Sequence, residues 1–173
     1  MSAQEVRGAE ITFDEFVTAT AGRLLRTAVF LVYDRHLAED LLQTAYERVA
    51  RRWKRIAAGN PEAYARRVLV NLAIDENKRR ARRRDFPAGS VADVERLAGA
   101  PPVAGAAGGD LDEVLRGLPP KQRAVVVLRY WCDLGEHEIA ETLGISRGTV
   151  KSHTARAMTA LREHLREGRA DGR

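Results

Sequence analysis

The sequence has a single cysteine and no long run of apolar residues. Because Cys132 has no second cysteine to pair with, an internal disulfide and a cysteine-rich metal site are both excluded. No stretch approaches the roughly 18 consecutive apolar residues of a membrane span, and the N-terminus lacks the basic start and apolar run of an export signal. We therefore expect no membrane segment and a protein that works in the reducing cytoplasm.

Sequence signatures of catalysis and cofactor binding are missing as well. No H-E-x-x-H motif and no phosphate-binding glycine loop before a helix occurs in the chain. The four histidines are scattered over polar helix surfaces: His36, His137, His153 and His164. We therefore expect no catalytic residue, no cofactor and no metal site, and the chain is not expected to be an enzyme.

Positive charge is plentiful and unevenly spread. The 173 residues carry a formal net charge of +5, and arginines outnumber lysines 25 to 4, a bias that hints at a GC-rich bacterial genome. Net charge is +6 over residues 1–84, −3 over 85–110 and +2 over 111–173. A basic first half suggests a polyanionic partner, although a solvated helix face also explains any single cluster.

Helical periodicity dominates, and the alternation typical of strands is nearly absent. We therefore predict an all-α protein. The first helix opens with a capping box, Thr12 and Glu15, and a second amphipathic helix follows from Leu37 to Trp53. A third begins at residues 60–62, where an asparagine cap precedes a proline at the first helical position, and it ends in the basic run 78–84.

Glycine, alanine and proline divide the chain into two domains. Residues 85–110 are rich in all three and acidic, which predicts a flexible linker that would extend to about 85 Å. We predict an N-terminal three-helix domain over residues 1–84 and a C-terminal domain over residues 111–173. In the latter we expect a short helix over 111–117, a break at two prolines and a buried helix from Lys121 to Trp131.

The segment 134–165 contains two helical patterns that meet at Gly144. Glycine suits the sharp turn, and Ser146 is placed to cap the second helix, whose inward face carries Val150 and Ala157. This arrangement predicts a helix-turn-helix, although a helical hairpin in a bundle gives a similar pattern.

The second helix of this segment presents a polar outer arc near its start. At about 100° per residue, the positions opposite Val150 hold short or hydrogen-bonding groups. Such a face suits the major groove, where Lys151 or Arg156 could read guanine and small residues allow close approach. Arg147 and Thr149 flank the arc and suit phosphate contacts. The arc consists of Gly148, Lys151, Ser152, Ala155, Arg156 and Thr159.

The order of these motifs resembles one family. The segments AEDLLQTAYERVARRW, NPEAYARRVLVNLAIDENKRRARRR and LPPKQRAVVVLRYWCDLGEHEIAETLGISRGTVKSH together resemble the extracytoplasmic-function (ECF) sigma factors, the smallest sigma subunits of bacterial RNA polymerase. The resemblance covers residues 12–84 and 111–166. It implies transcription initiation by promoter recognition, with core RNA polymerase and promoter DNA as partners and the nucleotide chemistry left to the core.

The resemblance also assigns a polymerase contact. In the family the second helix docks on a coiled coil of the largest polymerase subunit, through a signature that matches Asp40, Leu41 and Gln43. Thr44 stands where the family often has glutamate.

Two DNA contacts follow from the same resemblance. The loop from Arg55 to Asn60 and the third helix would open the duplex and hold a non-template base of the minus-ten element, with Ile56 at the stacking position and Asn71 against the base. A buried or capping role is the alternative for Asn71. The second helix of the helix-turn-helix would read the minus-thirty-five element. The expected DNA-binding residues are Arg55, Ile56, Asn60, Arg67, Asn71, Lys78, Arg79, Arg147, Thr149, Lys151, Ser152, Ala155 and Arg156.

Other functions remain open at this point. The family commonly uses an anti-sigma factor to hold the free protein inactive, so such a protein is a further expected partner. The motif GTVKSH also occurs in stand-alone helix-turn-helix transcription regulators, but their receiver or ligand-binding domain would need strands or a cavity that the first domain does not predict. A third hypothesis is that the chain is an RNA-binding helical protein.

Overall fold

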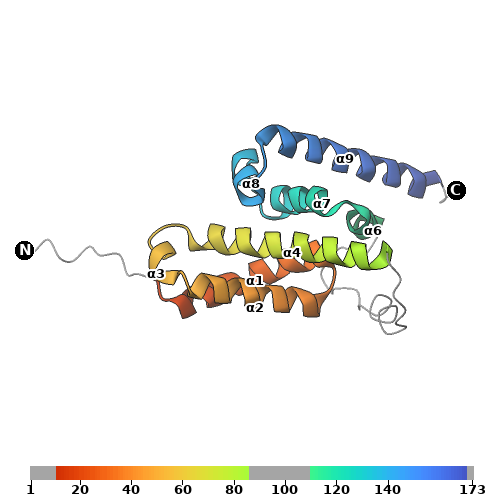
Figure 1. Cartoon of the computed structure of the whole chain (residues 1–173). Coiled ribbons are helices and arrows are strands. Elements are labelled where there is room, and N and C mark those ends of the chain that lie inside the picture. Colours follow the sequence, from red (N-terminus) through yellow and green to blue (C-terminus); the bar gives the residue numbers. More distant parts are fainter. Residues whose placement is uncertain (1–10, 86–109, 171–173) are drawn as a thin grey trace, which may run out of the picture.

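The computed structural model describes residues 11–85 and 110–170, and all regular elements in these ranges are helices (Figure 1). This confirms the all-α prediction; the predicted linker, apart from its two end residues, lies outside the described residues. The N-terminal part contains α1 (Phe13–Val32), α2 (Arg35–Ala50), α3 (Trp53–Ile56) and α4 (Pro61–Asp85). The C-terminal part contains α6 (Asp110–Gly117), α7 (Pro120–Val126), η1 (Val127–Trp131), α8 (Glu136–Leu143) and α9 (Arg147–Ala170).

Side-chain caps define where the N-terminal helices begin. The Thr12 amide donates to Glu15 Oε2 at 2.8 Å and the Glu15 amide donates to Thr12 Oγ1 at 3.3 Å, so the predicted capping box is confirmed. The Asn60 side-chain oxygen accepts from the Ala63 amide at 2.9 Å, as its place before Pro61 predicts. These bonds satisfy amides that have no partner within the helix.

The N-terminal core lies between α1, α2 and α4. Aromatic rings gather at one end of it, where Trp53 lies 5.4 Å from Phe13 and 5.2 Å from Phe16, centroid to centroid. The Tyr46 ring joins them, and its hydroxyl forms a 2.8 Å hydrogen bond with Thr20. Trp53 is therefore a half-buried member of this aromatic cluster that packs against the core.

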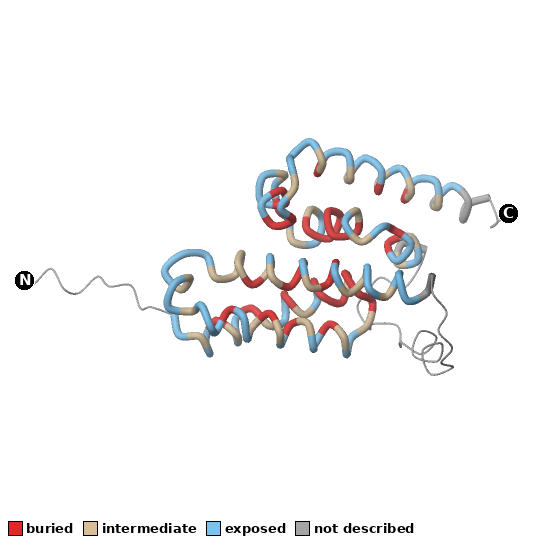
Figure 2. The backbone as a smooth tube through the Cα atoms, in the orientation of Figure 1, coloured by how far each residue is buried: buried red, intermediate tan, exposed pale blue. Residues whose placement is uncertain are grey.

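Helix α4 is buried on two sides. Ala65, Leu69 and Ala73 are fully buried and face the N-terminal core. Val70 and Ile74, at 0% and 4% exposure, are buried on another face, where α7 and α8 pack against the helix. Figure 1 shows α4 between the α1 and α2 layer and the C-terminal helices, and Figure 2 marks the buried positions along it. The sequence did not predict this second contact.

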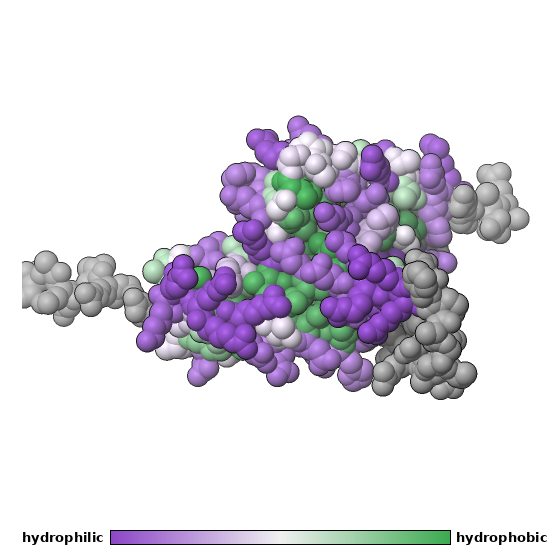
Figure 3. All heavy atoms as spheres, viewed as in Figure 1, coloured by the Kyte–Doolittle hydropathy of each residue, from purple (hydrophilic) through white to green (hydrophobic). Residues whose placement is uncertain are grey.

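The two parts therefore share one hydrophobic core. The buried residues of α1, α2 and α4 form a single cluster with those of α7, η1 and α8, including Val125, Leu128 and Ile139. In the space-filling view hydrophobic atoms reach the surface along the seam between the parts (Figure 3). A smaller cluster, formed with α6, α7 and α9, receives the ring of Tyr33 from the end of α1.

Arg123 is the polar link between the two parts. Its side chain is only 7% exposed, and its guanidinium donates to the carbonyl of Leu31 in α1 at 2.7 Å. It also donates to the carbonyls of Leu115 at 2.8 Å, Arg116 at 2.6 Å and Leu118 at 3.2 Å. Because a buried charge is tolerated only when its donors are satisfied, these four carbonyls fix where α6 and α7 sit on α1.

The helix predicted from Lys121 to Trp131 changes form half-way. From Val127 onward it is a π-helix, and the Cys132 amide donates to the Val127 carbonyl at 3.1 Å. The wider turn rotates the side chains that follow it. The prediction that Trp131 is buried is therefore wrong: Trp131 is 46% exposed and lies against Phe30 of α1, with 4.5 Å between ring centroids.

Replacing Arg123 with methionine is expected to lower the free energy of unfolding by about 3 kcal/mol, because the carbonyls around it lose their donor while the aliphatic volume is kept. Chemical denaturation followed by circular dichroism measures this change. Arg48→Met, at an exposed position of α2, is the matched control and should stay within about 0.5 kcal/mol of the wild type. Equal losses in the two variants would contradict the assigned role of Arg123.

Candidate nucleic-acid interface

Helices α8 and α9 form the predicted helix-turn-helix. Gly144 ends α8 with a φ of +63°, a left-handed conformation that glycine adopts without strain. Ser146 then caps α9, since its hydroxyl oxygen accepts from the Thr149 amide at 3.1 Å. Ile139 and Val150, both fully buried, pack the two helices onto the shared core.

The outer arc of α9 is exposed, as predicted. Most of the α9 backbone is coloured as exposed in Figure 2, whereas Ala157 and Leu161, on the side opposite the arc, are buried. The Ser152 hydroxyl donates a hydrogen bond to the Thr149 carbonyl at 3.0 Å, so this side chain stays close to the helix. The exposed residues of the arc and its flank are Arg147, Gly148, Lys151, Ser152, Ala155, Arg156 and Thr159.

Thr149 is less accessible than the sequence suggested. Its side chain is half-buried, and its hydroxyl lies 2.8 Å from the hydroxyl of Ser146 within the cap. A phosphate contact from Thr149 would compete with this hydrogen bond, so Arg147 is the better placed of the two flanking residues.

An acidic residue that the sequence did not single out lies beside the start of α9. Glu136, the first residue of α8, has carboxylate oxygens 3.9 Å from the Arg147 guanidinium and 3.8 Å from the Lys151 ammonium. Arg129 of η1 approaches the other oxygen at 3.8 Å. The contacts join three consecutive elements, and they depend on how η1, α8 and α9 fold back on one another, which the periodicity of a single helix does not show.

His153 lies half-buried on α9, next to the exposed arc. Burial lowers the pKa of its imidazole, and the positive charges of Arg156 and Lys121 lower it further. His153 is thus kept neutral at lower pH than an exposed histidine and adds no charge to the arc near neutral pH.

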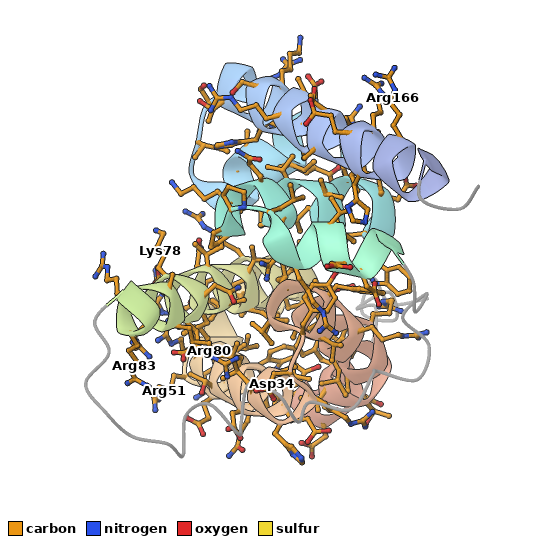
Figure 4. All side chains as sticks on the ribbon, turned by 90° about the vertical axis from the view of Figure 1, so that its right-hand side faces the viewer. Asp34, Arg51, Lys78, Arg80, Arg83 and Arg166 are labelled. Carbon is orange, nitrogen blue, oxygen red and sulfur yellow. The ribbon has the colours of Figure 1, made fainter. Side chains whose placement is uncertain are left out.

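A second exposed strip runs along α4, between its two buried faces. Arg67, Asn71 and Lys78 are all exposed and project within a narrow sector at 100° per residue. Figure 4 shows Lys78 projecting from α4 away from the bundle. Exposure of Asn71 rules out the buried alternative for this residue. The structure therefore brings these three predicted DNA-binding residues onto one surface.

The arginines near the end of α4 are not equivalent. Arg80 points inward to Asp34 and donates to its carboxylate at 3.0 Å (Figure 4). Burial alone would raise the pKa of Asp34, but hydrogen bonds from the Leu37 amide and Arg80 lower it overall. Arg79 is exposed and pairs with Glu76 on the same helix. Arg80 is therefore a structural residue, while Lys78 and Arg79 remain on the surface.

The other predicted contacts lie in α3 and in the turn before α4. The loop predicted from Arg55 to Asn60 therefore begins later than expected, because Arg55 and Ile56 belong to α3. Arg55 is exposed, whereas Ile56 is half-buried and packs against the shared core. Asn60 is exposed, with its side-chain oxygen engaged in the α4 cap. Tyr64 accepts a 2.8 Å hydrogen bond from Arg52, which holds its ring beside the loop.

The predicted polymerase contacts lie on α2. Asp40 and Gln43 are exposed and one helical turn apart, while Leu41 is half-buried against the core. Thr44 donates its hydroxyl to the Asp40 carbonyl at 2.9 Å and so does not extend from the helix. Beside Gln43 a shallow groove between α1 and α2 is lined by apolar side chains that include Leu42 and Tyr46.

Within the residues that the structure describes, no group of three or more histidine, cysteine or acidic side chains is arranged to hold a metal ion. The same residues contain no helix long and apolar enough to cross a membrane.

Two family models match the two parts of the chain. Sigma-70 region 2 matches residues 16–84, and Sigma-70, region 4 matches residues 109–161. The chain is 39% identical over 167 residues to the RNA polymerase sigma-E factor of Streptomyces avermitilis, covering 96% of this chain and 92% of the relative. It is 36% identical over 163 residues to the ECF RNA polymerase sigma factor SigE of Mycolicibacterium smegmatis, covering 89% of this chain and 62% of that protein.

A solved structure has the same fold. It is the sigma factor RpoE in complex with the anti-sigma factor NepR from Bartonella quintana, with a TM-score of 0.70 and 22% identity. The match covers 89% of this chain and 96% of that one.

Replacing Ser146 with alanine is expected to lower the free energy of unfolding by about 1 kcal/mol, because the Thr149 amide loses its cap. Ser152→Ala, which removes a hydroxyl from the exposed arc of the same helix, should change it by less than about 0.5 kcal/mol. Thermal unfolding of both variants measures the difference, and a smaller loss for Ser146→Ala than for Ser152→Ala would refute the cap.

Proposed function

The chain belongs to the ECF sigma factors of the sigma-70 family, and we propose that it uses three separate surfaces to select a promoter. It is a sigma factor that directs promoter recognition, and the stand-alone regulator is not favoured, since the matches to regions 2 and 4 span both parts. The surfaces are the exposed side of α2 for core RNA polymerase, the α4 strip for the minus-ten element and the α9 arc for the minus-thirty-five element.

This proposal makes the protein a non-enzymatic subunit. Core RNA polymerase carries out the nucleotide chemistry in the cytoplasm, and this chain contributes promoter choice and strand opening. The similar structure from Bartonella quintana contains an anti-sigma factor, which supports a protein of that kind as a third partner.

The observation that carries the proposal is the asymmetry of α9. Its inner side is buried in the shared core and in the smaller cluster, so the helix cannot turn without loss of packing. Its outer side presents Lys151 and Arg156 around the small residues Ser152 and Ala155. Long basic side chains around short ones fit the major groove, where the former reach base edges and the latter permit close approach.

The α4 strip suits the opened strand. Arg67 and Lys78 supply positive charge for phosphates, and Asn71 between them offers an amide that can pair with the edge of an unstacked base. Ile56 lies half-buried at the end of α3, where an apolar side chain can support such a base.

Simultaneous contact with both promoter elements is proposed to involve separation of the two parts. In the described structure α7 and α8 rest on α4, which holds both DNA-binding surfaces on one compact body. We propose that binding to the polymerase separates the parts and that the predicted linker, with its extended reach of about 85 Å, permits this.

The double variant Asp40→Ala, Gln43→Ala is expected to weaken binding to core RNA polymerase about tenfold, because both exposed contacts are removed from α2. Fluorescence anisotropy of the labelled chain titrated with core enzyme measures it. Glu163→Ala, an exposed acidic position on α9, controls for lost negative charge and should bind as the wild type does. Wild-type affinity in the double variant would exclude this side of α2 as the docking surface.

Arg156→Ala is expected to lower discrimination at one upstream promoter position by about 1–3 kcal/mol, because the side chain is placed to read a base edge. Holoenzyme binding is compared across single-base variants of a promoter that the wild-type holoenzyme selects from genomic fragments. The control is Arg162→Ala, further along α9, which should leave discrimination unchanged. An equal loss on every variant would make Arg156 a phosphate contact.

A further inference from the structure

The carboxylate of Glu136 is surrounded by positive charge. Arg129, Arg147 and Lys151 approach it at 3.8, 3.9 and 3.8 Å, and they come from η1 and from the first two turns of α9. The Glu136 side chain is 26% exposed, whereas that of Glu141 on the same helix is 67% exposed. Partial burial limits the screening of these charges by salt, so they interact more strongly than charges on the open surface.

The distances distinguish these contacts from structural ion pairs. Arg80 and Asp34 lie 3.0 Å apart within a hydrogen bond, and Arg23 and Glu62 lie 2.9 Å apart. The three contacts of Glu136 are longer than a hydrogen bond, so the attraction is electrostatic and can be exchanged for another anion without loss of a directional bond. Arg147 and Lys151 keep 66% and 65% of their side chains exposed and are able to leave the carboxylate.

We propose that Glu136 competes with DNA for the cations at the start of α9. The proposal rests on the proposed function, in which the start of α9 contacts promoter DNA. In the free protein the carboxylate lies beside Arg147 and Lys151, and DNA has to displace it. Arg129 lies on the other carboxylate oxygen and retains Glu136 when the α9 cations move to DNA.

Such a competitor weakens DNA binding by the C-terminal part on any sequence. Salt screens the pairs with Glu136 as well as the contacts with DNA. The competition therefore weakens as the salt concentration rises, and the dependence of affinity on salt becomes shallower. The effect restrains the helix-turn-helix from binding bulk DNA independently of the polymerase.

The test compares Glu136→Gln with Glu141→Gln in the full chain. Both variants remove one negative charge from α8, but only the first removes it from beside Arg147 and Lys151. Affinity for a labelled duplex of arbitrary sequence is measured over a series of potassium chloride concentrations. Glu136→Gln is expected to bind about two- to tenfold more tightly than Glu141→Gln, with a log–log salt slope steeper by about one to two. Glu136→Asp keeps the charge and should resemble the wild type.

Each outcome decides the question. Equal affinities and salt slopes for the two glutamine variants would mean that Glu136 acts only through the net charge of the protein. Weaker DNA binding by Glu136→Gln would mean that Glu136 positions the cations for DNA. Either result overturns the proposal. Thermal unfolding verifies that both variants are folded. Wild-type holoenzyme on a selected promoter and on a scrambled duplex is measured in parallel. If the holoenzyme binds both duplexes equally well, the result counts against the proposed function. If the holoenzyme prefers the promoter but Glu136→Gln and Glu141→Gln have the same affinity and salt slope, only the proposed role of Glu136 is overturned.

Discussion

The arrangement of the whole molecule depends on the guanidinium of Arg123. The carbonyl of Leu31, near the end of α1, accepts a hydrogen bond from Arg123 and another, at 2.8 Å, from the side-chain amide of Asn77 in α4. A single carbonyl thus ties α1 to α4 and to the C-terminal part. Arginine suits this position because its planar fork directs several donors at once, whereas a lysine ammonium could not reach carbonyls on α1 and α6 together. The rings and side chains around it, including Tyr33, exclude water and strengthen these bonds.

The contacts of Arg123 also determine which surfaces remain available. With α7 and α8 held on α4, that helix keeps one exposed strip, and α9 lies farthest from the N-terminal core with its outer arc exposed (Figure 1). The predicted DNA-binding residues of α4 and α9 therefore stand on helices whose other sides are packed. Burial of Leu69 and Val70 fixes the rotation of α4, and this rotation directs the neighbouring Asn71 side chain outward.

Local signals predicted much of this structure. The capping residues Thr12, Asn60 and Ser146 mark helix starts because a cap involves only a few neighbouring residues. Contacts between distant segments were not predictable in the same way. Val70 and Ile74 are buried on a second face of α4, and their burial depends on α7 and α8, which lie far from them in sequence. The outward turn of Trp131 follows from a π-turn that has no recognised sequence signature, and the charges around Glu136 meet only when η1, α8 and α9 come together.

The double burial of α4 has a consequence for every partner of the protein. When the C-terminal part leaves α4, Val70 and Ile74 lose their cover at the same time as Val125 and Leu128. Apolar surface newly exposed to water raises the free energy of the separated form. The apparent affinity of a partner that binds only the separated form is therefore reduced in proportion to the fraction of molecules in that form. A partner that binds both parts while they stay packed together does not have to break this apolar contact. Where the polymerase binds only the separated form, as proposed above, its occupancy by this sigma factor depends on an equilibrium internal to the chain as well as on the proposed docking residues.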